Sequence, residues 1–178
     1  QDLAGANLKV AELSNADFSN ANLAGATLLA ANMVGTRFDR ANLQGADLSR
    51  SFLIGSTFHD ADLTDAILAN ANLEGTDLSG ANLTNVFWVG AQFKDVNLTG
   101  ANLTGVKLRG VDLSEAILCN TTMPSGDIAN RDCPYTNTSV GIRHFIFPQI
   151  PDGIDLFLGV LVGATLPSPP TSFRFIGS

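Results

Sequence analysis

The chain has 178 residues, which is enough for one well-buried domain or one repetitive array with an appendage, and too few for two large domains. Its 17 acidic and 10 basic residues give a formal net charge of -7, which argues against nonspecific binding to nucleic acid or anionic lipid and favours a basic partner. No run of about 18 apolar residues is present, so no transmembrane segment is predicted.

The first 120 residues repeat a pattern with a period of five. Every fifth residue from Leu3 to Leu118 is Leu, Phe, Met or Trp, at 24 consecutive positions. The residue two positions before each of them is never larger than Val from Ala6 onward, so both series are expected to point inward. A period of five matches neither a helix nor a strand, and it suits a chain that turns a corner every five residues.

The predicted corners lie two residues after each large apolar residue. This position is Gly, Asn or Asp in 19 of the 24 repeats, and these residues tolerate the positive φ that a type II turn requires at its third residue. Four corners close a square coil of 20 residues, so residues 1–120 are expected to form six coils that stack through parallel backbone hydrogen bonds.

This repeat resembles the pentapeptide repeat family, whose consensus is Ala-(Asp/Asn)-Leu-x-x, over residues 1 to about 120. The resemblance implies an all-β fold, a right-handed quadrilateral parallel β-helix, here of about six coils. The residues after the repeats are expected to form a C-terminal cap and an irregular tail, and the tail departs from the family pattern. The expected domains are 1–120 for the β-helix, 121–133 for a disulfide-closed cap and 134–178 for an apolar, proline-rich tail.

Aromatic residues inside the repeat are interpreted as core packing and not as a cofactor site. Positions 20 apart stack on one wall, so Phe18, Phe38 and Phe58 are expected to form a ladder inside the coils. Trp88 lies on another inward column and receives the same interpretation.

Residues with catalytic or metal-binding chemistry are sparse. The two histidines are His59, at an outward position, and His144, in the tail, so no histidine metal site is predicted. No phosphate-binding glycine loop, zinc-protease motif or nucleophile elbow occurs, and a coil with a solid core offers no cleft. We therefore predict a protein that is not an enzyme and needs no cofactor or metal.

Asn or Asp precedes the large apolar residue in 14 of the 24 repeats. A ladder of this kind could bind metal or mimic phosphates, but stacked amides and carboxylates also form hydrogen bonds with the backbone and with each other. We favour the second, structural interpretation.

Several outward positions break the polar pattern and are the predicted partner-binding residues: Phe52, Ile54, Ile67, Phe87 and Val89. Ile67 and Phe87 are 20 residues apart at positions that are normally Asn or Asp. Regular clusters of exposed apolar residues mark docking faces, although tolerated drift and cover by the tail are alternatives.

The period stops after Leu118, where a segment with both cysteines follows. Cys119 and Cys133 flank one loop, which favours a disulfide over a metal site and indicates an oxidising compartment. The stretch from Cys119 to Cys133 also resembles the ending of cyanobacterial and chloroplast pentapeptide repeat proteins, several of which reside in the thylakoid lumen. This resemblance implies a lumenal location, or alternatively a periplasmic one, and a noncatalytic role.

Two functions remain open. The first is a structural or interaction module of the thylakoid lumen that docks on a photosynthetic membrane complex, or assists its assembly, through the walls and through the tail from Phe145 to Leu166. The second is an acidic mimic of DNA that binds DNA gyrase, as some members of the family do. Basic residues interrupt the acidic surface, and the proline- and glycine-rich tail is a poor helix, so we favour the first function and predict no nucleic-acid partner.

Overall fold

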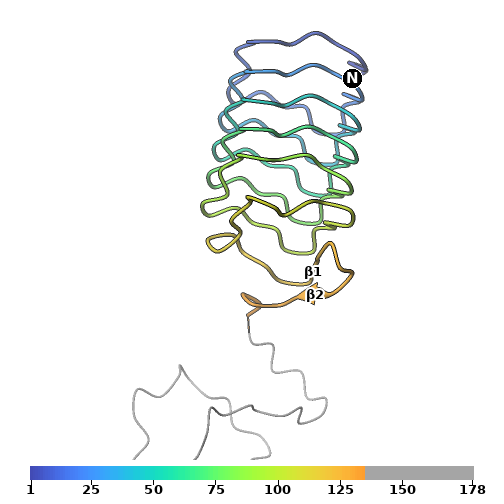
Figure 1. Cartoon of the computed structure of the whole chain (residues 1–178). Coiled ribbons are helices and arrows are strands. Elements are labelled where there is room, and N and C mark those ends of the chain that lie inside the picture. The colour runs from blue at the N-terminus through green and yellow to red at the C-terminus, as the bar shows by residue number, and fades with distance from the viewer. Residues whose placement is uncertain (135–178) are drawn as a thin grey trace, which may run out of the picture. The chain divides into compact units, whose positions relative to one another are not determined.

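The computed structural model describes residues 1–134, which wind into a stack of similar coils (Figure 1). Nineteen single-residue parallel bridges join positions that are 20 residues apart, from Asp2 with Asn22 to Asn102 with Thr122. The only longer strands among the described residues are β1 (Thr121–Thr122) and β2 (Ile128–Ala129), which pair antiparallel. The prediction of an all-β coil with a 20-residue period agrees with this arrangement, and residues 1–134 contain no helix with the length and apolarity needed to cross a membrane.

The corners lie at the predicted positions. Every fifth residue from Gly5 to Gly110, and also Asn120, has a φ in the left-handed region. The following N–H donates to the carbonyl three residues back and closes the turn, as Ala6 N does to Leu3 O at 3.0 Å. Four corners lack the expected Gly, Asn or Asp and still adopt φ values between 54° and 57°: Val10, Ala30, Arg40 and Arg50. Stacking on the neighbouring coils therefore outweighs the local preference at these sites.

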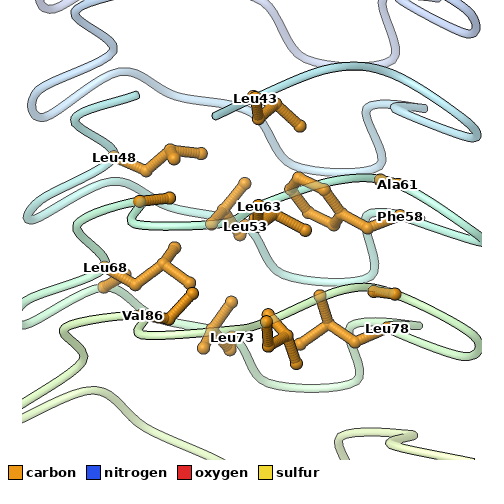
Figure 2. Packing of buried hydrophobic residues seen from close by; sticks show 14 of the residues in the cluster. Leu43, Leu48, Leu53, Phe58, Ala61, Leu63, Leu68, Leu73, Leu78 and Val86 are labelled. Carbon is orange, nitrogen blue, oxygen red and sulfur yellow. The ribbon is translucent and has the colours of Figure 1, made fainter. Parts of the chain in front are cut away.

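The predicted inward residues form one continuous core. Leu63, Leu73 and Phe58 are fully buried, and Figure 2 shows such side chains filling the space between the walls. The rings of Phe18 and Phe38 stack with centroids 5.4 Å apart, and those of Phe38 and Phe58 with centroids 4.7 Å apart. These separations are close to the spacing of about 4.8 Å between neighbouring strands, so parallel rings fit the stack without separating the coils. The aromatic ladder is confirmed.

The segment after the repeats is bonded to the last part of the described coil. A disulfide joins Cys119 to Cys133, with a Cα–Cα distance of 4.6 Å. Within the loop that it closes, Asp132 Oδ2 accepts a hydrogen bond from Leu118 N at 2.9 Å. The Arg131 guanidinium beside Asp132 lowers the pKa of that carboxyl, and it also donates to the carbonyl of Ala116. These bonds attach residues 119–133 to the last part of the coil.

Candidate functional site

The side chains of the Asn and Asp column form structural hydrogen bonds. All 14 side chains accept a hydrogen bond from the backbone N–H two residues further on, as Asp17 Oδ1 does from Ser19 N at 2.9 Å. Several also bond from coil to coil, as Asn97 Nδ2 does to Asp77 Oδ1 at 3.0 Å. The structural interpretation of this column is confirmed.

Neither metal-site geometry nor a histidine site is found in the part of the chain that the structure describes. Residues 1–134 hold no group of three or more His, Cys, Asp or Glu arranged around a possible ion. The exposed ring of His59 contacts Ser79 Oγ through Nδ1 at 3.0 Å and Asp60 Oδ2 through Nε2 at 3.1 Å. His144, and the predicted docking segment from Phe145 to Leu166, lie outside the described residues.

The predicted partner-binding residues are exposed and fall into two patches. The first, called the Phe87 patch, consists of Ile67, Phe87 and Val89; Ile67 and Phe87 are bridged neighbours on one wall. The second, called the Phe52 patch, consists of Phe52 and Ile54 and lies on a different wall, where Phe52 is bridged to polar neighbours. Phe52 and Phe87 are each 51% exposed, which is high for such large apolar side chains. The structure therefore places these five residues on the surface but not in a single cluster.

Sequence reasoning passed over other exposed apolar residues. Ile117 is exposed at a position of the repeat that is normally Asn or Asp, so the rule that identified Ile67 and Phe87 would also have found it. Ile128, in β2 of the cap, is also exposed but follows no repeat that could have pointed to it.

The stack of coils opens at one place. Among the described residues, the series of bridges is interrupted only where Phe87 would pair with Lys107 and Gln92 with Asp112. The next two positions, Asn97 and Asn102, are bridged again to residues 20 further on. Two walls are therefore separated and the other two remain closed, and in Figure 1 the dark yellow coil departs from the even spacing of the coils before it.

On the wall of Gln92 the missing bonds define an open edge, formed by residues 91–95 and 110–115. One coil earlier the same wall is closed by Leu73 N to Gln92 O at 3.1 Å, Gly75 N to Lys94 O at 2.9 Å and Gln92 N to Ala71 O at 3.0 Å. The three corresponding donors one coil later, Phe93 N, Asp95 N and Asp112 N, have no such bond to a described residue. Glu115, at the corner of this segment, also lacks the left-handed φ of the other corners.

Two aromatic rings meet in the interior where the coils separate. Trp88 and Phe93 pack edge to face, with centroids 4.7 Å apart and an interplanar angle of 82°. The other residues of these two inward columns are Leu or Met. The two walls that carry this aromatic pair are the two walls whose bridges to the next coil are missing. Trp88 is fully buried as predicted, and its Nε1 has no hydrogen-bond partner among the described residues.

A cavity of about 360 Å³ lies at the open edge and is open to solvent. Its lining residues are Ala91, Gln92, Phe93, Lys94, Gly110, Asp112, Ser114 and Glu115. Lys94 Nζ donates to Glu74 Oε1 at 2.9 Å, and this bond raises the pKa of Lys94. The N–H of Ser114 donates to Asp112 Oδ1 at 2.9 Å and lowers the pKa of that carboxyl. Sequence reasoning missed this cavity.

Comparison with known families identifies the repeat. The family model described as pentapeptide repeats matches the chain in eight copies, over residues 2–40, 41–80, 76–115 and 89–123. A pentapeptide repeat protein from the thylakoid lumen of Arabidopsis thaliana is 37% identical, over 61% of this chain and 68% of that chain, with a TM-score of 0.42.

Two other solved structures are similar to this chain. HetL, a pentapeptide repeat protein involved in heterocyst differentiation regulation in the cyanobacterium Nostoc sp. strain PCC 7120, is 31% identical. The match covers 72% of this chain and 64% of HetL, slightly less than two thirds of its length, with a TM-score of 0.35. A form of QnrB1, a plasmid-mediated fluoroquinolone resistance protein, is 20% identical over 71% of this chain and 78% of that chain, with a TM-score of 0.42. No curated protein sequence matches the chain.

Proposed function

Because the chain belongs to the pentapeptide repeat family, whose members fold as right-handed β-helices, we propose that it is a structural, protein-docking module and not an enzyme. The observation that carries the proposal is the Phe87 patch, where Ile67 and Phe87 stack on one wall at positions that are otherwise polar in most repeats. The β-helix comprises six coils over residues 1–120, and the disulfide-closed segment 121–133 serves as its cap.

The proposed location is the thylakoid lumen, with the periplasm as the alternative. The disulfide between Cys119 and Cys133 supports an oxidising compartment, because disulfides are rare in proteins of reducing compartments. The 37% identity to a thylakoid lumen protein of Arabidopsis supports the same location. In this setting the partner is a photosynthetic membrane complex or one of its assembly intermediates.

The energy of such docking comes mainly from apolar surface. Burying the Phe87 and Phe52 patches on a partner stabilises a complex by about 25 cal/mol per Å² of apolar surface, before the costs of association are subtracted. The tail from Phe145 to Leu166, outside the described residues, is proposed as a second docking element on the basis of its apolar sequence.

Binding to DNA gyrase is the second candidate function, and the net charge of -7 favours it. Against it, basic side chains interrupt the acidic walls: Arg37, for example, lies between Asp17, at 3.8 Å, and Asp39, at 3.4 Å.

We expect the purified protein to leave DNA supercoiling by gyrase unchanged, and inhibition at micromolar concentration would favour the gyrase function over docking.

Replacing Ile67 with Asn and Phe87 with Asp restores the polar pattern of the repeat and is expected to weaken partner binding without unfolding the protein. Loss of two buried apolar side chains of about 1.5 to 3 kcal/mol each predicts a loss of affinity of at least tenfold. The measurement is recovery of partner proteins from solubilised thylakoids with the immobilised double variant, with circular dichroism to verify the fold.

A matched control is the pair Thr27→Asn and Asp47→Asn, which lies on the same wall in preceding coils. This control should recover the partner as the wild type does. If the Ile67 and Phe87 variant unfolds, these residues serve the fold instead; if it folds and recovers the partner at the wild-type level, the Phe87 patch is not the docking site.

A further inference from the structure

We propose that the open edge on the wall of Gln92 binds an extended, basic peptide segment of the protein partner, which adds a strand between the two separated coils. This inference deepens the proposed docking function and rests on it, because it names the kind of segment that the partner supplies. The site is formed by residues 91–95 on one side and 110–115 on the other.

The backbone supplies the affinity. Phe93 N, Asp95 N and Asp112 N lack the bonds that close this wall one coil earlier, and so do the carbonyls of Ala91, Asp112 and Ser114 that would have accepted them. Backbone donors and acceptors are obligatory hydrogen-bonding groups, and an unpaired strand edge is a template for another chain. A parallel segment between the two sides would give each side the backbone hydrogen bonds that it lacks at the opening.

The cavity is large enough for part of a peptide. Its volume of about 360 Å³ is many times the roughly 30 Å³ share of one liquid water molecule. The walls of Asn97 and Asn102 remain bridged to the following coil, so a segment enters from the open side and does not thread through the core.

The negative charge at the open edge favours a basic peptide segment. Lys94 is paired with Glu74, and the charge of Glu115 also raises the pKa of Lys94, so this lysine partly offsets Glu115. Two carboxylates, Asp112 and Glu115, line the cavity with this one cation, so the lining is net negative. Lys107 and Arg109 precede the corner at Gly110 and do not line the cavity. Lys or Arg side chains on the bound segment complement these carboxylates.

The test starts from a library of random heptapeptides displayed on phage and selected on the full chain. Peptides that contain Lys or Arg and lack Pro are expected to be enriched, since Pro has no N–H to donate. Methylating alternate backbone nitrogens of an enriched peptide should weaken its binding at least tenfold in fluorescence anisotropy. Hydrogen exchange should be fast at the amides of Phe93, Asp95 and Asp112 in the free protein and should slow when the peptide binds.

Two sets of variants localise the site. The pair Trp88→Leu and Phe93→Leu gives the inward columns the residues of the other coils, so the edge should close and peptide affinity should fall at least tenfold. The pair Asp112→Asn and Glu115→Gln retains a side-chain oxygen at position 112 that accepts the hydrogen bond from Ser114 N. Because the pair removes two negative charges, it should weaken peptide binding several-fold and reduce the salt dependence of peptide binding. Phe58→Leu, which replaces a ring in a closed part of the stack, is the matched control and should leave binding unchanged.

The inference is overturned if no peptide is enriched, if the methylated peptide binds as well as the parent, or if binding protects none of the three amides. Equal binding by the Asp112 and Glu115 variant at low salt overturns the requirement for a basic segment. These failures leave the docking function standing as long as the Ile67 and Phe87 variant loses the native partner, so the two proposals are distinguishable.

Discussion

Replacing Leu63 with Asp is expected to abolish folding of the β-helix. Leu63 is fully buried in the middle of the stack, and its N–H donates to Asn82 O at 2.8 Å as part of the coil-to-coil ladder. Truncating a buried Leu costs about 2 to 5 kcal/mol, and an unpaired carboxylate at the same place costs several kcal/mol more. Together these terms reach the total stability of about 5 to 15 kcal/mol of a typical domain.

The measurement is circular dichroism with size-exclusion chromatography, which should show an expanded or aggregated chain. Asn70→Asp is the control, because Asn70 is an exposed corner and other corners of the chain already carry Asp at a positive φ. The control should behave as the wild type. A folded Leu63→Asp protein with an unchanged unfolding midpoint would contradict the inward register of the repeat.

Replacing Phe38 with Ala is expected to destabilise the protein by about 3 to 5 kcal/mol, the usual range for a buried Phe. The ring of Phe38 is fully buried between Phe18 and Phe58, with centroids at 5.4 Å and 4.7 Å, so the change removes two stacked contacts and leaves a cavity between coils. Equilibrium unfolding in urea measures the loss. Because each coil contacts mainly its neighbours, the coils before residue 38 are expected to unfold first.

Phe87→Ala is the matched control for this measurement, since Phe87 is 51% exposed. Its effect on the free energy of unfolding is expected to stay below about 1 kcal/mol, as for most surface changes. Equal losses for Phe38→Ala and Phe87→Ala would contradict the difference in burial between the two rings.

The core and the corners could be predicted from sequence because one physical rule is repeated 24 times. A single Phe or Gly says little, but Phe18, Phe38 and Phe58 at intervals of 20 residues fix both the register and the coil length. The corners at Arg40 and Arg50 were predicted from the period alone, against the preference of Arg for a negative φ. Repetition therefore outweighed local propensity in the prediction as it does in the structure.

The open edge could not be predicted in the same way. Trp88 and Phe93 both satisfy the rule for large inward residues, and their edge-to-face packing becomes visible only in three dimensions. Glu115 stands at a corner where Gly, Asn or Asp is usual, but four other corners also lack these residues and keep the regular φ, so Glu115 alone did not mark this segment in the sequence. The exposure of Ile67 and Phe87 could be predicted from the register of the repeat. The identity of a partner could not, because it depends on the partner's surface as well.

Site-specific photo-crosslinking in intact thylakoids tests the docking function most directly. A photoreactive phenylalanine analogue at position 87 samples the Phe87 patch, and the same analogue at position 7 samples an exposed position on the same wall at the other end of the stack. Docking through the Phe87 patch predicts one dominant protein adduct at position 87 and none at position 7. No adduct at position 87, or the same set of adducts at both positions, would contradict it.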